Sequence, residues 1–435
     1  MQKTLWLVIV CLSGPVLWAQ HNNRAARDLQ FQFGNPGARS LAFGGAFIGM
    51  ADDATAPVVN PAGMVQTRKR SASLELAYVR SENTIPFTGG EVVQTNLFEF
   101  DFNFDQGSFP ENRFQVPYAA VLIPAGDWRW AVFVHQQADL RRQYTTDRVN
   151  FDLLTTSSLT IAYDASQDDL ALDLWNAGLS VARQWGEHVS AGISLWWSDM
   201  DYHANSTILL QDAVGSIHPV YQTAEGQDQD WGGVLGLLWL VNDQFSVGAT
   251  YKRQGEFGYT AAQRASVVNP DSPDFQAEGL FKVPDALSIG CSVKASDTFS
   301  VNLDINRVYY SQITDNLLDF QRVPGVFQEM PDVTEIHVGA EQAFLGGANP
   351  VFVRIGYWRD PYHAAVNNIE DSQILDGTSR DPRVRDFFFL HSFEKDVNHY
   401  AFGLGLSFSQ VFQMDCAYEW SELDQKLSVS GIYRF

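Results

Sequence analysis

Residues 400–420 read YAFGLGLSFSQVFQMDCAYEW. From Tyr400 to Phe408, and again from Phe412 to Trp420, large apolar side chains alternate with small or polar ones. Successive side chains of a strand point to opposite faces, so each half predicts a strand with one apolar face. The short link between the halves predicts an antiparallel hairpin. Such a hairpin suits a wall between lipid and an aqueous lumen.

The chain ends with the same pattern. Large or small apolar residues share one face of the final segment: Leu427, Val429, Gly431, Tyr433 and the terminal Phe435. A last strand that ends in Phe resembles the recognition signal of the barrel-assembly machinery of Gram-negative outer membranes. The resemblance implies that this machinery is a partner during insertion.

The connections between alternating segments predict the number of strands. Short turns are expected at Pro124–Asp127, Gly186–His188, Asn242–Gln244, Ala295–Thr298, Leu345–Pro350 and Ser409–Val411. Long polar connections are expected at 82–113, 139–174, 203–229, 259–282, 312–332 and 360–397, with one further short link from Ser421 to Asp424. Barrels of the outer membrane have short periplasmic turns and longer outer loops. The expectation is therefore an all-β fold, a fourteen-stranded antiparallel transmembrane barrel with both ends of the wall on the periplasmic side.

Composition agrees with this fold class. Of the 435 residues 45% are hydrophobic and 13% aromatic, and beyond the first twenty residues no apolar run approaches the length of a spanning helix. The formal net charge of −22 would repel nucleic-acid phosphates, so we expect no nucleic-acid partner. Solvated acidic loops account for this charge without a cation site.

The first residues predict a secretory signal, with Lys3 ahead of an apolar run from Leu5 to Leu17 and a cleavage point after Ala19. Two cysteines follow the signal, Cys291 and Cys416, and both are expected to face outward on strands far apart around the wall. We expect no disulfide between them.

Residues 34–64, GNPGARSLAFGGAFIGMADDATAPVVNPAGM, differ from the strand pattern. Their spaced glycines permit close backbone approach, and Asn60-Pro61-Ala62-Gly63 reads as a tight turn. A segment this small buries little apolar surface alone, so we expect it inside something larger. The stretch resembles the N-terminal hatch of the outer-membrane long-chain fatty-acid transporter family (FadL/TodX-type). Val283-Pro284-Asp285-Ala286 and the passage from Pro382 to Tyr400 extend that resemblance.

The resemblance implies three parts: a signal peptide at 1–19, a plug at 20–70 and a transmembrane barrel at 71–435. It also implies a function, passive uptake of hydrophobic molecules such as long-chain fatty acids or hydrocarbons. In the family such ligands enter from outside, reach a lumenal pocket and leave sideways through a gap in the wall. An alternative is a barrel of the same fold that docks protein partners of a secretion system.

Candidate site residues fall into three groups. The plug motif is Asn60, Pro61, Ala62 and Gly63, in which Asn60 is expected to hold the plug through hydrogen bonds. Apolar residues of the outer connections are candidates for ligand capture: Ile208, Leu209, Leu210, Phe257, Phe275 and Phe281. Ile208-Leu209-Leu210 with Val214 and Ile217 would form the apolar face of a short helix, and packing between loops is an equal alternative. Phe387-Phe388-Phe389-Leu390 is expected to pack across the barrel mouth or to flank the next strand.

Strand parity directs a polar set into the lumen: Glu75, Arg129, His135, Asn302, Asp304, Asn306, Glu335, His337, Glu341, Arg354, Asp415, Glu419 and Arg434. Among them Arg129 and Arg354 are candidates for binding a ligand carboxylate, whereas acid–arginine pairs that brace the wall are the more frequent use of such residues. The chain has no local motif of a hydrolase, zinc protease or nucleotide site. We therefore expect no enzyme, no cofactor and no metal, and a monomer in contact with outer-membrane lipid.

Overall fold

The computed structural model describes residues 31–96, 99–153, 159–163, 165–211, 215–265, 275–315, 328–347, 349–364, 366–367, 395–409 and 411–435. Residues 1–19, where the sequence predicts a signal peptide, and residues 387–390 lie outside the described residues. Within these ranges no helix is long and apolar enough to cross a membrane.

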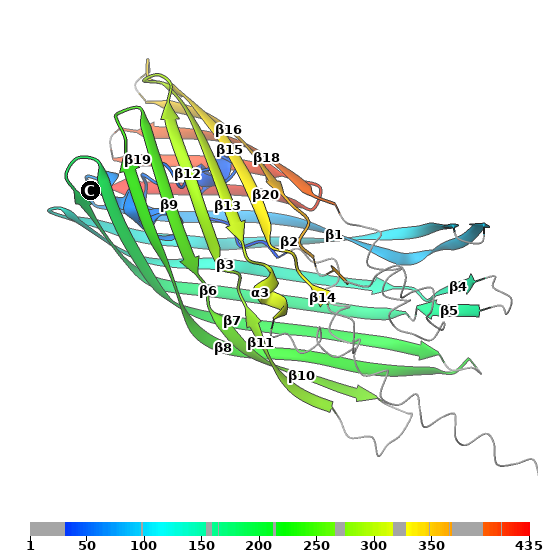
Figure 1. Ribbon diagram of the computed structural model, residues 1–435. Helices are drawn as coiled ribbons and strands as arrows, with labels where there is room; N and C mark the ends of the chain where they lie inside the picture. Colours follow the sequence, from blue (N-terminus) through cyan, green and yellow to red (C-terminus); the bar gives the residue numbers. More distant parts are fainter. Residues whose placement is uncertain are drawn as a thin grey trace, which may run out of the picture.

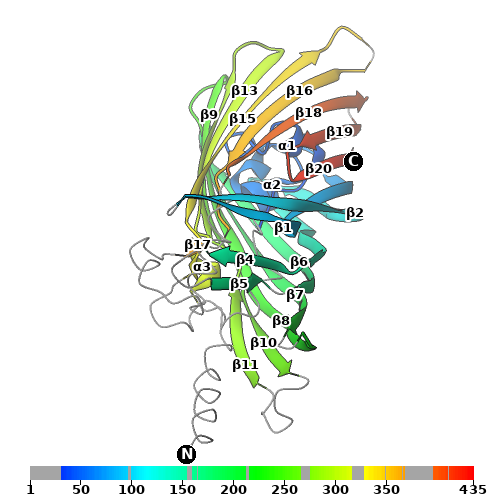
Figure 2. The ribbon, with the colours of Figure 1, turned by 90° about the vertical axis from the view of Figure 1, so that its right-hand side faces the viewer.

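Fourteen strands of the described chain form a closed antiparallel wall (Figures 1 and 2). In chain order they are β1 (Ser71–Asn96), β2 (Glu99–Ala125), β3 (Trp128–Thr146), β6 (Ser166–Trp185), β7 (Val189–Gln211), β8 (Ile217–Leu240), β9 (Phe245–Arg253), β12 (Ala286–Lys294), β13 (Phe299–Val308), β15 (Val333–Phe344), β16 (Val351–Asp360), β18 (Val397–Phe408), β19 (Phe412–Trp420) and β20 (Asp424–Arg434). Pairing of Ser71 with Arg434 joins the first and last strands and closes the ring. The expected strand number is confirmed.

The six short turns and the link before Asp424 lie where the sequence predicts them. Alternation also sets the outward face: Phe402, Leu404, Tyr418 and Trp420 are exposed, whereas Ala401 and Ala417 on the opposite face are buried. Cys291 and Cys416 are free thiols, as expected.

Four of the expected long connections are wrong because the strands continue through most of them. β1 and β2 have 26 and 27 residues, and β7 and β8 have 23 and 24, whereas β9, β12 and β19 have 9 each. Beyond the lipid layer both faces of a strand meet water, so the apolar alternation ends while the backbone ladder continues. The barrel is therefore tall on the side of β1–β8 and short on the side of β12–β20 (Figure 1).

The upper end of β8 makes an extra pairing. Its Gly233–Leu240 half pairs with β9, while Val220–Glu225 pairs with β10 (Glu256–Ala265), which in turn pairs with β11 (Phe275–Lys282). The β10–β11 hairpin thus extends the wall above β9 and β12. Short elements also lie at this end: β4 (Val149–Leu153), β5 (Leu159–Tyr163), β14 (Gln328–Glu329), β17 (Val366–Asn367) and helix α3 (Ser311–Thr314).

Three short helical turns occupy the lumen ahead of β1: α1 (Ala38–Ala42), α2 (Ala56–Val59) and the 3₁₀ turn η2 (Pro61–Gln66). Figure 2 shows them inside the ring. α1 contacts β16 and β18–β20, and η2 contacts β3 and β6–β8. Residues 37–66 are called the plug below.

Candidate functional site: a lumenal cavity beside an opening in the wall

Asn60 fixes the plug to itself and to the wall. Its Nδ2 donates to the carbonyl oxygens of Ile48 (2.9 Å) and of Leu237 on β8 (3.1 Å), and its Oδ1 accepts from the Ala62 N–H (3.2 Å). All of Asn60 is buried. The hydrogen bonds expected of Asn60 are therefore present, because its amide offers two donors and an acceptor at the point where Pro61 turns the chain.

Two wall carboxylates bind plug backbone amides. Asp304 Oδ2 accepts from the N–H groups of Phe47 (2.6 Å) and Ile48 (2.8 Å), and Glu75 Oε2 accepts from Gly37 N–H (2.7 Å). The irregular plug backbone cannot satisfy these donors itself, and a buried unpaired donor is costly. Strand parity placed both carboxylates inward, but the sequence carried no signal for their partners.

Plug and wall meet at backbone distance. A Cβ on Gly356 of β16 would overlap the backbone nitrogen of Gly44, and one on Gly236 of β8 would overlap the Asn60 side chain. Gly44 has a φ of +63°, a conformation that favours glycine. The plug therefore fits one position in the lumen.

Above the plug lies a cavity of about 340 Å³. Its floor includes Gly45 and Ile48, and residues 31–36, called the N-terminal segment below, cross it. The wall contributes apolar groups and also charged ones, among them Arg113 of β2, Lys252 of β9 and Glu335 of β15. The lining is thus amphipathic.

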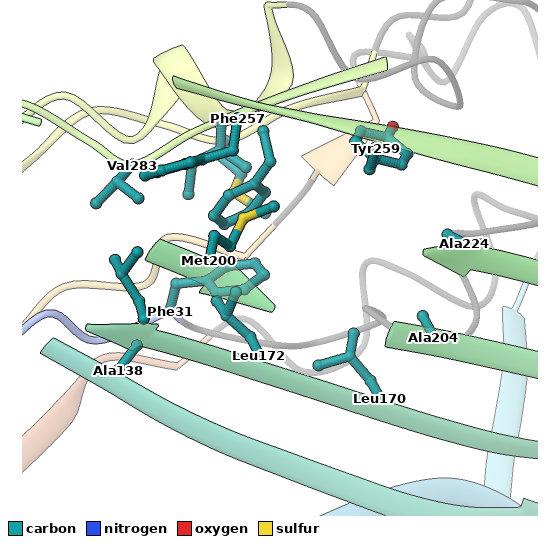
Figure 3. Close-up of a cluster of buried hydrophobic side chains, with 14 of the residues drawn as sticks. Phe31, Ala138, Leu170, Leu172, Met200, Ala204, Ala224, Phe257, Tyr259 and Val283 are labelled. Atoms are coloured by element: carbon teal, nitrogen blue, oxygen red, sulfur yellow. The ribbon is translucent and has the colours of Figure 1, made fainter. Parts of the chain in front are cut away.

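An apolar cluster, called the outer cluster below, lies next to this cavity (Figure 3). Phe257, Phe281 and Val283 come from the β10–β11 hairpin and the turn after it, and Phe31 packs on Phe281 with ring centroids 5.5 Å apart. Leu172 of β6 belongs to this cluster and also lines the cavity. Outer cluster and cavity are therefore contiguous.

His363, in the connection after β16, holds the N-terminal segment. Its Nε2 lies 2.9 Å from the Phe31 carbonyl oxygen, and its Nδ1 lies 2.9 Å from the Pro361 carbonyl oxygen and 3.2 Å from Asp360 Oδ1. Its ring stacks on Tyr310 at 3.8 Å, and Gln32 Nε2 donates to Asp360 Oδ2 (3.1 Å). Carbonyl oxygens only accept, so both ring nitrogens donate together when the imidazole is charged.

The backbone ladder of the wall is interrupted between β2 and β3, and this interruption is called the wall opening below. Their ladder runs from Ala125–Trp128 to Tyr118–His135, and the described parts of the two strands form no pair beyond it, although β2 continues against β1 and β3 against β6. Pro117 lacks an N–H at this point, and β3 carries a bulge between Gln136 and Ala138.

The wall opening lies beside the cavity. Pro117 and Ala138 at its edges also line the cavity. Outside, the neighbouring side chains Phe114 and Val116 of β2 are apolar and 85% and 48% exposed. The opening is therefore bordered by a lipid-facing surface.

The two candidate arginines brace the barrel. Arg354 is fully buried, and its Nε and Nη1 donate to Glu341 Oε2 and Asp415 Oδ1, both at 2.6 Å. Arg129 lies at the turn end of β3, where it donates to the carbonyl oxygens of Thr67, Gly126 and Trp128. Neither residue lines the cavity. Their assignment to a ligand carboxylate is therefore not favoured by their position.

The capture candidates are distributed differently from the sequence prediction. Residues 208–210 continue strand β7 to Gln211, so the expected helix is wrong. Ile208 is buried, whereas Leu209 is exposed, and the Leu210 backbone pairs with His218. Alternation in register with β6 and β8 overrides the local helical spacing. Phe275 begins β11, and Phe257 and Phe281 are brought together in the outer cluster.

Sequence reasoning missed Arg113, Gln115 and Lys252 at the cavity. Arg113 is the last residue of the long connection expected at 82–113 and Gln115 lies just beyond it, so the alternation gave no inward assignment for either. Lys252 Nζ makes one long hydrogen bond to Asn35 Oδ1, at 3.4 Å. No cluster of His, Cys, Asp and Glu within the described ranges is arranged to hold a metal.

The profile of one protein family matches residues 29–366, and its description is outer membrane protein transport protein (OMPP1/FadL/TodX). Solved structures share the fold at low identity. The CymD monoaromatic hydrocarbon channel is 16% identical, with a TM-score of 0.57 over 93% of this chain and 99% of that one. A Pseudomonas aeruginosa FadL homologue is 13% identical, with a TM-score of 0.60 over 90% and 96%. The P. putida toluene transporter TodX is 14% identical, with a TM-score of 0.56 over 93% and 99%. No curated protein matches the sequence.

Proposed function

Because the chain belongs to the OMPP1/FadL/TodX family of outer membrane transport proteins, we propose that it takes up long-chain fatty acids passively through its lumen and its wall. Members of this family are outer membrane channels and transporters of hydrophobic compounds, not enzymes. The protein accordingly resides in a Gram-negative outer membrane as a fourteen-stranded barrel.

One observation carries the proposal: the amphipathic cavity above the plug reaches a wall opening whose outer border is apolar. An opening of this kind suits a solute that moves from the cavity into the bilayer. It favours transport over the alternative of docking a secretion partner.

The proposed route has three stages. A ligand first meets the outer cluster around Phe257 and Phe281, then enters the cavity past the N-terminal segment, and then leaves between β2 and β3. Apolar contact at each stage contributes roughly 25 cal/mol per Å² of buried surface, so the ligand need never become fully hydrated. Pro61 and its neighbours Ala62 and Gly63 keep the plug below this route.

A carboxylate-bearing ligand fits the cavity better than a neutral hydrocarbon. Lys252 forms no ion pair within 4.0 Å with any described side chain, although it lines the cavity. A ligand carboxylate would supply a charge-assisted hydrogen bond there. CymD is a monoaromatic hydrocarbon channel and TodX a toluene transporter, so hydrocarbons are the competing ligand class.

Other partners are part of the same proposal. The terminal Phe435 is exposed beside Tyr433, as recognition by the barrel-assembly machinery requires. The exposed apolar band of the wall would contact outer-membrane lipid, and the barrel is complete in one chain, which supports a monomer.

Deletion of the gene tests the function. Cells without the protein are expected to take up radiolabelled hexadecanoate more slowly, and the wild-type gene should restore the rate. Mass spectrometry of lipids that co-purify with the protein would identify the natural ligand. Unchanged uptake together with blocked protein secretion would refute the proposal and support the docking alternative.

A further inference from the structure

The wall opening is bridged by side chains where the backbone ladder stops. Gln115 Nε2 of β2 donates to Asp139 Oδ2 of β3 at 3.0 Å. This hydrogen bond spans the two strand edges just beyond Tyr118 and His135, the last ladder pair. Both residues also line the cavity, so the bond lies between the cavity and the bilayer.

Each partner of this bond has a second possible contact nearby. Asp139 Oδ1 lies 3.5 Å from Arg141 Nε, so the carboxylate keeps a cationic neighbour if Gln115 moves away. On the other edge Arg113 donates to Ser81 Oγ (2.9 Å), while its Nε and Nη1 are buried and have no hydrogen-bond partner among the described residues. Arg113 and Gln115 have the same strand parity and both line the cavity.

These positions are suited to an exchange of partners. A carboxylate in the opening would accept hydrogen bonds from Gln115 and Arg113, while Asp139 would remain with Arg141. Such an exchange replaces one charge-assisted hydrogen bond by others of the same kind. A neutral apolar ligand offers no acceptor, so it would have to break the bond without replacement.

We propose that the Gln115–Asp139 hydrogen bond is a latch on the wall opening, and that an anionic head group opens it by taking the donors of Gln115 and Arg113. The inference rests on the proposed lateral route and adds the residues that select the ligand at its exit. It makes the exit, rather than the cavity alone, a point of discrimination between amphiphiles and hydrocarbons.

Initial uptake rates of hexadecanoate and of its methyl ester test the latch, because the two ligands share a chain and differ in the head group. The rates are measured in cells that carry each variant, with the deletion background subtracted. The wild-type protein should favour the acid. In Gln115→Ala the ester should pass faster and the acid-to-ester ratio should fall about tenfold, the scale of one hydrogen bond to a charged group.

Asp139→Ala and the double variant Gln115→Ala/Asp139→Ala complete a cycle. Asp139→Ala should lower the ratio less than Gln115→Ala does, because it removes the bond but leaves the Gln115 donor for the acid, and the double variant should match Gln115→Ala. Gln229→Ala is the matched control. It removes a glutamine–aspartate contact to Asp199 (2.6 Å) between β7 and β8, which the backbone ladder already joins, so the ratio should stay at the wild-type value.

The outcomes separate the two proposals. If wild-type cells transport neither ligand above background, the proposed function fails and the latch fails with it. If both are transported and the ratio is unchanged in all variants, or falls additively in the double variant, only the latch is wrong. Heat-modifiable migration in gels confirms beforehand that each variant is a folded barrel.

Discussion

Asn60 joins three backbone groups with one side chain, which makes it the most informative single residue of the plug. Asn60→Ala would leave the carbonyl oxygens of Ile48 and Leu237 and the N–H of Ala62 without their partner. We expect the plug to lose about 1–3 kcal/mol of stability. Hydrogen exchange of residues 47–66 should increase, and uptake should be impaired while the barrel remains assembled.

Ser190→Ala is a control for this variant, because it removes a single hydrogen bond from the wall to the Ala62 carbonyl oxygen. Its effect on exchange should be smaller. Unchanged exchange and uptake in Asn60→Ala would show that the motif only shapes a turn.

Arg354 offers a second prediction for a single residue. Arg354→Met would leave Asp415 buried without its guanidinium and would free Glu341. Breaking a buried pair in this way costs about 3–5 kcal/mol. The urea midpoint of tryptophan fluorescence in detergent should fall clearly.

The matched control is Arg359→Met, which removes an ion pair with Asp396 at the outer end of the same strand. The Arg359 side chain is 57% exposed and its ion pair is screened by solvent, so its loss should leave the midpoint almost unchanged. Equal shifts of the two midpoints would contradict the bracing role of Arg354.

Among the larger elements, the N-terminal segment is expected to respond to pH. Burial lowers the pKa of His363, but the hydrogen bond and charge of Asp360 outweigh burial, so the pKa lies above its ordinary value of 6.5. Tyr310 stacks on the His363 ring, and Gln32 donates a hydrogen bond to Asp360. Because the pKa of His363 is raised in the folded state, its charged contacts stabilise the N-terminal segment fully below about pH 6.5. This stabilisation is lost as the pH rises through the raised pKa.

Protection factors of residues 31–36 should therefore fall between neutral and alkaline pH. In His363→Gln they should be low throughout and independent of pH. A wild-type protection factor that stays constant across this range would contradict the charged contact to Phe31.

The sequence predicts the turns of the wall better than its loops. Alternation is clear in β18–β20, where one face meets lipid, and each expected turn is confirmed. The apolar–polar alternation is lost in the outer parts of β1, β2 and β8. Polar residues occur there on both faces of the strand, so the sequence predicts a loop. The helix expected at Ile208 is wrong for a related reason, since pairing with Ser166 and Val220 decides the local structure.

Fewer features of the candidate site than of the fold could be predicted from the sequence. The plug motif is a local pattern and could be recognised, and parity directed Asp304 and Glu75 inward. The cavity could not be derived, because Arg113, Lys252 and His363 meet the N-terminal segment or the opening only after the ring has closed. The contacts of Lys252 with Asn35 and of His363 with Phe31 join residues more than two hundred positions apart and leave no periodic signal.

For the molecule as a whole we expect transport without an energy source. The chain carries no recognisable nucleotide motif, and burial alone can move an apolar ligand along the route. Outer-membrane vesicles that contain the protein should equilibrate with added hexadecanoate faster than vesicles without it. The final level should be the same in both, because a passive channel changes only the rate.

An ionophore that collapses ion gradients is the control for this measurement. The rate should not change when it is added. Accumulation above the equilibrium level, or a rate that depends on the gradient, would contradict passive transport.

The tight fit of plug and wall also constrains the order of assembly. Gly356 touches Gly44 and Gly236 touches Asn60 without room for a Cβ, and the plug is hydrogen-bonded to strands from β1 to β15. The ring closes between Ser71 and Arg434, which are the wall positions farthest apart in the chain, so this pairing has the largest loop-closure entropy to overcome. A preformed cylinder would leave no passage for so closely held a segment. The plug must therefore be seated while the sheet is still open, and it then serves as the template around which the last strand meets the first.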